Sequence, residues 1–74
     1  MPRFTLIRFD RYDTTQSIIS HHDLSTTNLV EAFKQTINKL WGGEDFEWVF
    51  KKIKENSNKV GMDFEEESYL FFEN

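Results

Sequence analysis

Apolar residues occupy both faces of the first segment of the chain that is patterned as a β-strand, Arg3 to Tyr12. Phe4 and Leu6 fall on one face of the pleat, and Ile7 and Phe9 fall on the other. A strand that is apolar on both faces is typical of the interior of a sheet. The pattern therefore predicts that this segment is the central strand.

A second, shorter strand is predicted from Ser17 to His22, where Ile18 and Ile19 face opposite ways. The residues before it, Asp13 to Gln16, are polar and favour a turn. We therefore expect a β-hairpin. Because the turn has no Asn-Gly or Asp-Gly pair, the sequence leaves its register open.

The strongest helical pattern begins after Leu24. Ser25 is a good N-cap, and Leu24 and Leu29 have the spacing of a hydrophobic staple. Glycine adopts the left-handed conformation that a helix C-terminus often needs, so Gly42 and Gly43 are expected to end the helix. Between these limits, the apolar residues recur at three- and four-residue steps and form one face: Leu29, Val30, Phe33, Ile37, Leu40 and Trp41.

A second helix is predicted from Glu44 to Asn56. Acidic residues cluster in its first turn and lysines towards its end, which matches the helix macrodipole. Trp48 lies off the centre of the apolar stripe, so the sequence leaves its burial open, whereas Trp41 is expected in the core. The stripe itself consists of Phe46, Val49, Phe50 and Ile53.

The last part of the chain has a less decisive pattern. Asn56 to Lys59 is expected to be an exit loop. Met62 to Glu67 alternates at first and then becomes acidic, which leaves strand and loop both open. The segment from Tyr69 to Phe72 is apolar on both faces and is the last predicted strand.

These elements predict one α+β domain over residues 1–74. We expect a small single-layer sheet of about three strands in the order β-β-α-α-β, at least partly antiparallel, with two helices packed on one face. The last strand is expected to pair with the central strand, on the side away from the hairpin partner. The face without helices would then show some of an apolar set that marks a partner surface: Ile7 and Phe9, or Leu70 and Phe72.

Composition explains how so short a chain can build a core. Its 74 residues include eight Phe, two Trp and two Tyr, but no Cys. Disulfides and thiolate zinc sites are therefore excluded as sources of stability, and burial of large aromatic rings takes their place. No segment has the length and hydropathy of a signal peptide or a membrane span. From this we expect a soluble, cytoplasmic protein that does not engage a membrane.

Negative charge is concentrated in the second part of the chain. Residues 1–42 hold five basic and four acidic side chains, whereas residues 43–74 hold four basic and nine acidic ones. An acidic surface beside aromatic residues favours a partner with a basic groove, including one that normally holds nucleic acid. A solvated acidic loop before an edge strand explains the same pattern. The candidate partner-binding residues are Asp63, Glu65, Glu66, Glu67, Trp48 and Tyr69.

Other chemistry has little support in the sequence. The cations are too scattered for a phosphate-binding stripe, which disfavours direct binding of nucleic acid. His21 and His22 are neighbours in a strand, so their imidazoles should point to opposite faces and not converge on a metal ion. Gly42-Gly43 lacks the strand before it and the Lys after it that a phosphate-binding loop needs. We therefore expect no catalytic residue, metal or cofactor.

The sequence predicts a non-enzymatic protein-binding module, of the accessory or inhibitory kind that phages and mobile elements encode to block nucleic-acid-handling complexes. If the module mimics nucleic acid, its carboxylates would stand where phosphates sit on the partner. A homodimeric structural protein that pairs through a sheet edge or face is the alternative. A weak nucleic-acid binder and a minimal histidine enzyme remain as further alternatives.

Overall fold

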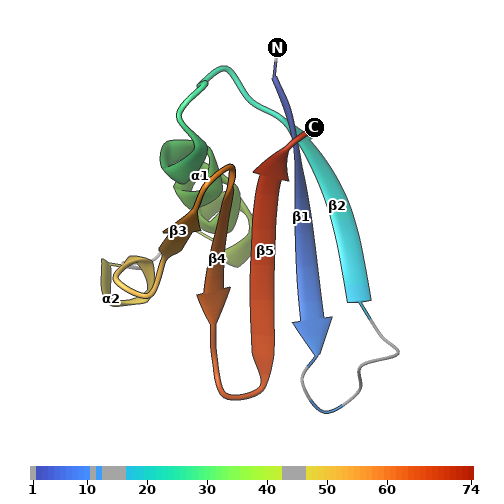
Figure 1. The fold of residues 1–74 in the computed structure, drawn as a ribbon, viewed down its shortest axis with the longest axis vertical. Helices are drawn as coiled ribbons and strands as arrows, with labels where there is room; N and C mark the ends of the chain where they lie inside the picture. The colour runs from blue at the N-terminus through green and yellow to red at the C-terminus, as the bar shows by residue number, and fades with distance from the viewer. Residues whose placement is uncertain (1, 11, 13–16, 43–46) are drawn as a thin grey trace.

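The computed structural model describes residues 2–10, 12, 17–42 and 47–74 of the chain. Its strands form one antiparallel sheet in the order β2-β1-β5-β4-β3 (Figure 1). The elements in chain order are β1 Arg3–Asp10, β2 Ser17–Asp23, α1 Leu29–Trp41, α2 Glu47–Phe50, β3 Lys54–Asn56, β4 Lys59–Asp63 and β5 Glu67–Glu73.

The prediction that the first strand lies inside the sheet is confirmed. β1 pairs with β2 on one side and with β5 on the other, both antiparallel. The hairpin and the pairing of the last strand were therefore predicted correctly. β1 is shorter than expected, because it ends at Asp10, and Tyr12 is exposed. The predicted turn at residues 13–16 lies outside the described residues.

The predicted three-stranded sheet with two packed helices is wrong, because the sheet has five strands and, within the described residues, α1 is the only long helix. The predicted second helix, Glu44 to Asn56, is reduced to the four residues of α2; its first three predicted residues lie outside the described ones. Its end is instead the edge strand β3, where Glu55 pairs with Val60 of β4.

Tertiary pairing overrides helical periodicity in this segment. Ser57 adopts a left-handed conformation, φ 60°, between β3 and β4. The predicted exit loop is thus the turn of a hairpin. This turn lets β3 pair with the backbone groups on the outer edge of β4, which a helix would leave without a strand partner. Met62 and Asp63 finish β4, while residues 64–66 form the turn into β5.

α1 starts later than predicted. Leu24 still donates its backbone N–H to the carbonyl of Pro2, 3.1 Å away, so the chain is extended there and Ser25 does not cap the helix. Asn28 is the cap, and its side chain accepts a hydrogen bond of 2.9 Å from the backbone N–H of Glu31. The predicted end is confirmed, because Gly42 is the left-handed C-cap, with φ 88°.

The core lies between α1 and one face of the sheet, which we call the helix face. Phe71 of β5 stands at its centre, with its ring stacked on Phe4 and tilted against Phe33, at 5.2 Å between centroids in each pair. All three side chains are fully buried. The other buried apolar residues are Leu6, Ala32, Ile37, Val49, Val60, Met62 and Tyr69.

The other side of the sheet, which we call the open face, is also apolar at its centre. Alternation puts every second residue there, and in β1 and β5 these positions include four large apolar residues beside Arg3, Thr5 and Ser68. In the described part of the chain, α1 and the core it buries lie on the helix face (Figure 1). The prediction of an uncovered apolar set is confirmed, and β2 adds one residue to it: the set is Ile7, Phe9, Ile19, Leu70 and Phe72.

Candidate partner-binding groove

A groove of about 510 Å³ opens on the helix face, where the end of α1, α2 and the β4–β5 turn meet β1. We call it the acidic groove. It brings together residues from five parts of the chain, and four of the six predicted partner-binding residues line it. The lining residues are Arg8, Trp41, Trp48, Val49, Phe64, Glu65, Glu66 and Glu67.

Aromatic rings form the wall of the acidic groove. Trp41 lies 6.2 Å from Phe64 and 5.8 Å from Tyr69, measured between ring centroids, and Phe64 meets Tyr69 edge-on at 6.0 Å. These contacts hold Trp41 against the edge of the core, where it is half-buried, so the prediction that it lies in the core is only partly met. Tyr69 meets both other rings edge to face, whereas Trp41 and Phe64 are tilted against each other, so the three rings form one packed aromatic cluster.

Trp48 stands apart from this packed wall. Its position in the short helix α2 leaves 64% of it exposed, while the next residue, Val49, is buried and anchors α2 on the core. The sequence left this burial open, and the structure shows a large indole at the rim of a groove. Exposed tryptophan beside a groove is a common anchor of protein interfaces.

Glu67 forms the polar floor of the groove and is held by two partners. Arg8 Nε donates to Glu67 Oε2 at 2.6 Å, and the Tyr69 hydroxyl donates to Glu67 Oε1 at 2.8 Å. Both carboxylate oxygens are therefore engaged within the protein. Burial, and then the hydrogen bond to Glu67, raise the pKa of Tyr69 to about 12, so this hydroxyl stays protonated and keeps donating.

Glu65 and Glu66 are the carboxylates that the groove presents to solvent. The turn that carries them is closed by the backbone N–H of Phe64, which donates to the carbonyl of Glu67 at 2.8 Å. Both glutamates are exposed at the tip of this turn, above the aromatic wall. The arrangement joins an apolar surface to negative charge at its rim.

The structure does not bring all of the predicted residues together. Met62 points into the core, so the next residue, Asp63, lies on the open face. Its carboxylate is 3.8 Å from Lys54 Nζ there. Tyr69 is buried and supports the groove from beneath. The acidic run in the sequence is thus divided between the two faces of the sheet.

Arg8 and Phe64 belong to the groove, although the sequence analysis did not place them in a site. A signal for Arg8 was present: it continues the alternation of Phe4 and Leu6, which puts a cation on the buried face of an interior strand. Such a residue needs an acidic partner nearby. Phe64 had no comparable signal, because the sequence pattern around it fits a strand and a loop equally well.

The histidines lie far from this groove in the sheet and do not converge, as predicted. His21 Nδ1 is 3.1 Å from the Thr5 hydroxyl, whereas His22 Nε2 is 2.9 Å from the Ser20 hydroxyl on the other face. Over the described residues, no group of three or more acidic or histidine side chains is placed to hold a metal ion.

Comparison with models of known protein families, with curated proteins and with solved structures gives no match. Within the described ranges, no helix has the length and hydropathy to cross a lipid bilayer. The arguments about function therefore rest on the two surfaces of this fold.

Proposed function

We propose that the protein is a non-enzymatic binding module that holds a cationic segment of a partner protein in the acidic groove. One observation carries the proposal: Trp48 and the Glu65–Glu66 pair come from separate elements and line the same groove. This joins an aromatic anchor to two solvent-exposed carboxylates. The complementary ligand is a peptide segment with Arg or Lys next to an apolar side chain.

The energetics favour a cationic side chain over a neutral one. An Arg or Lys over an indole face contributes about 0.5–1 kcal/mol when exposed and about 2 kcal/mol when desolvated. The protein already makes contacts of this type, since Lys52 Nζ lies 5.8 Å from the centre of the Phe64 ring. Carboxylates at the rim would add attraction at long range and speed the encounter.

The same charge argues against nucleic acid as the direct ligand. Arg8 is engaged by Glu67 and the Lys52 ammonium lies on the Phe64 ring, so the cations described at the groove are few and do not form a basic stripe. A partner that uses a basic surface for nucleic acid fits the groove better. We expect this binding to occur in the cytoplasm, and the module would act by occupying the partner's surface.

The test is affinity capture with matched variants. Tagged wild-type protein, Trp48→Ala and Glu65→Lys/Glu66→Lys are used to capture proteins from a nuclease-treated lysate of the source cells. The charge-matched control is Glu55→Lys/Glu73→Lys, because both of these glutamates are exposed outside the groove. We expect one stoichiometric partner that is retained by wild type and control, and at least tenfold less by each groove variant.

Salt dependence gives a second readout on the captured partner. Because the Glu65 and Glu66 carboxylates are exposed, their attraction is screened as ionic strength rises. Binding of the wild type should weaken with salt, and reversal of both charges should flatten that dependence. Equal affinity of wild type and both groove variants would overturn the proposal.

A further inference from the structure

β2 forms one edge of the sheet, and its register fixes which of its backbone groups point outward (Figure 1). An antiparallel ladder alternates between residues whose N–H and C=O groups bond to the neighbouring strand and residues whose groups point away from it. The backbone N–H of Leu24 donates to the carbonyl of Pro2, one step beyond the pair of Arg3 and Asp23. Counting back in steps of two leaves four residues of β2 whose backbone groups point outward: Ser17, Ile19, His21 and Asp23.

The other side of β1 gives the same assignment. The backbone N–H of Asn74 donates to the carbonyl of Arg3 at 2.8 Å, so the odd-numbered residues of β1 bond to β5 and the even-numbered ones bond to β2. Within the described residues, no strand pairs with the outward groups of β2. An edge of this kind is a template for another strand.

The two edges of the described sheet differ in how they deter such pairing. β3 is only three residues long and includes Lys54 and Glu55, and short, charged edge strands resist the addition of a further strand. β2 is seven residues long and contains no Pro and no Lys, and its one acidic residue, Asp23, stands at its end. β2 is therefore the edge that is open to pairing.

The exposed isoleucines of β2 indicate that a strand, and not a ligand on one face, covers this edge. Ile18 is 62% exposed and Ile19 is 58% exposed. They point to opposite faces, because Ile18 pairs with Arg8 on the helix face and Ile19 pairs with Ile7 on the open face. A ligand docked on either face would cover one of them. A strand beside β2 covers both, because its own side chains alternate between the faces in the same way.

We propose that β2 pairs antiparallel with β2 of a second copy of this chain, so that two five-stranded sheets join into one continuous sheet. The two-fold axis runs perpendicular to the sheet beside Ser20, whose own backbone groups point to β1. Ile19 of each copy then lies opposite His21 of the other, and their outward N–H and C=O groups bond to each other. In the same register, Ile18 lies opposite His22 and Ser17 lies opposite Asp23, so all seven residues are paired.

The strand supplied by a second copy suits this edge in length and in charge. It has the same seven residues and outward groups at the same alternate positions, as a two-fold interface requires. The antiparallel register puts the two Asp23 side chains at opposite ends of the interface, whereas a parallel one would set like charges side by side. Lys39 of α1 acts electrostatically on His22, two residues from the axis, so the two copies carry this cation on opposite sides of the axis.

The size of the contact predicts an exchanging dimer. Seven residues at ~3.4 Å each give a strand edge about 24 Å long, which is smaller than a standard interface. We therefore expect monomer and dimer to coexist between micromolar and millimolar concentration. Paired residues of antiparallel strands point to the same side, so both helix faces, and with them both acidic grooves, lie on one side of the joined sheet. The pairing needs no ligand in the grooves and does not depend on the proposed function.

A proline in β2 provides the first test. Ile19→Pro removes an N–H that points away from β1, a position where an edge strand tolerates proline. Ile19→Ala is the matched control, because it shortens the same side chain and keeps the N–H. Sedimentation equilibrium is measured for both variants and the wild type, with circular dichroism as the check of folding. We expect the wild type to reach twice the 8.9 kDa chain mass. Ile19→Pro should weaken dimerisation on the order of a hundredfold, and Ile19→Ala by less than about tenfold.

Disulfide formation locates the axis. The chain has no Cys, so Ser20→Cys introduces a single thiol at the axis, where the two Cα atoms of a pair that is not hydrogen-bonded lie about 4.5 Å apart. Mild oxidation should link two copies of this variant. It should not link two copies of Ile18→Cys, whose Cα atoms would lie about 14 Å apart along the strands.

Two results would overturn the proposal. One is a wild-type monomer throughout the concentration range, which would leave the β2 edge to a strand of another protein. The other is a dimer that Ile19→Pro leaves intact or that oxidation links through Ile18→Cys and not through Ser20→Cys, because such a dimer would not pair through β2 about Ser20.

Discussion

The two faces of this sheet are built by the same strands and both carry large apolar side chains, yet the described part of the chain covers only one of them. Phe71 and Phe72 are neighbours in β5. Phe71 is fully buried between two aromatic rings, whereas Phe72 lies on the open face. The difference shows that hydrophobicity alone did not decide which face became the core. The core is the face against which α1 packs.

The hydrogen bonds and ion pairs of side chains also differ between the two faces. The helix face holds the network of Arg8, Glu67 and Tyr69, in which both carboxylate oxygens have partners. The ion pairs of the open face, Arg3 with Asp23 and Lys54 with Asp63, are longer and more exposed. Exposed pairs of this kind contribute little to stability. The side chains of the helix face are therefore held in place by their contacts. The open face, in contrast, has apolar area that the described part of the chain leaves uncovered.

The largest effect is expected from truncating the two neighbouring phenylalanines. Phe71→Ala removes the ring at the centre of the core and should lower the free energy of unfolding by about 3–5 kcal/mol. Phe72→Ala should cost the isolated chain much less, because its ring leaves no closed cavity. Urea unfolding of both variants at low protein concentration measures the difference. Equal losses would mean that the open face is part of the core of a single chain.

A smaller effect is expected at Gly61, where the open face should tolerate a larger side chain as poorly as the core does. Gly61→Ala brings a Cβ to 2.8 Å from the backbone oxygen of Tyr69, so the two strands must move apart. Overpacking of this kind costs about 1–3 kcal/mol. Asp63→Ala, on the same face of the same strand, is the control and should change stability by less than ~0.5 kcal/mol. Thermal unfolding distinguishes the two, and a neutral Gly61→Ala would refute the close contact.

The smallest effect is a pH dependence that should separate the adjacent histidines. Burial on the helix face, and then the charge of Lys39, lower the pKa of His22 below its ordinary value of 6.5. The unfolded chain therefore binds this proton more readily than the folded one. Stability contributed by neutral His22 is complete above about pH 6.5 and is lost as the pH falls below it.

Unfolding curves at a series of pH values measure this loss. His22→Gln should reduce the fall in stability below about pH 6.5. His21→Gln, on the open face, is the matched comparison and should reduce the fall much less, because the charge of His21 is the smallest of the three causes that lower the pKa of His22. The same pH profile in wild type and His22→Gln would show that the desolvation of His22 does not affect folding.

The sequence predicted the parts of the fold that depend on local pattern and on two-sided apolar strands. Phe4, Leu6, Ile7 and Phe9 were sufficient to place β1 inside the sheet, and the apolar end of the chain identified its neighbour β5. The glycine at position 42 marked the end of α1. These features were predictable because each residue's preference agreed with the final structure.

The prediction failed in the region after α1, where the helical preference of the local sequence disagrees with the strand pairing in the folded protein. Val49, Phe50 and Ile53 have helical spacing, yet the chain leaves the helix after Phe50 so that Lys54–Asn56 can pair with β4. The strand gains backbone hydrogen bonds to β4, and the helical spacing of the apolar residues gives no sign of that pairing. For the same reason the sequence grouped Asp63 with Glu65 and Glu66, but it could not show that Asp63 ends β4 on the open face while the two glutamates lie in the turn at the groove.

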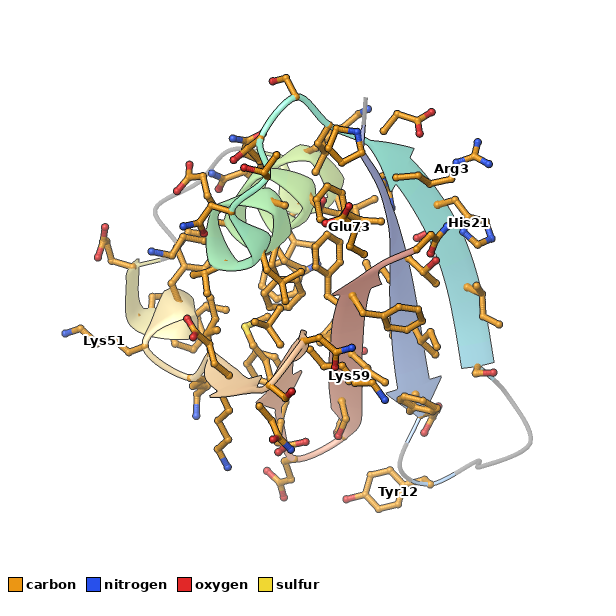
Figure 2. The ribbon with its side chains drawn as sticks, turned by 45° about the horizontal axis from the view of Figure 1, so that its top comes forward. Arg3, Tyr12, His21, Lys51, Lys59 and Glu73 are labelled. Carbon is orange, nitrogen blue, oxygen red and sulfur yellow. The ribbon has the colours of Figure 1, made fainter. Side chains whose placement is uncertain are left out.

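The place of β5 in the sheet has a consequence for synthesis of the protein. β5 lies between β1 and β4, and the backbone N–H of Asn74 donates to the carbonyl of Arg3 at 2.8 Å, so the two ends of the described chain lie side by side (Figure 1). Figure 2 labels Arg3 of β1 and Glu73 of β5, the strands to which these two ends belong. During translation, the β1–β2 hairpin, α1 and the β3–β4 hairpin all leave the ribosome before the strand that joins them. The sheet can close only when residues 67–73 have emerged, which makes folding of this domain an event that follows the synthesis of its last strand.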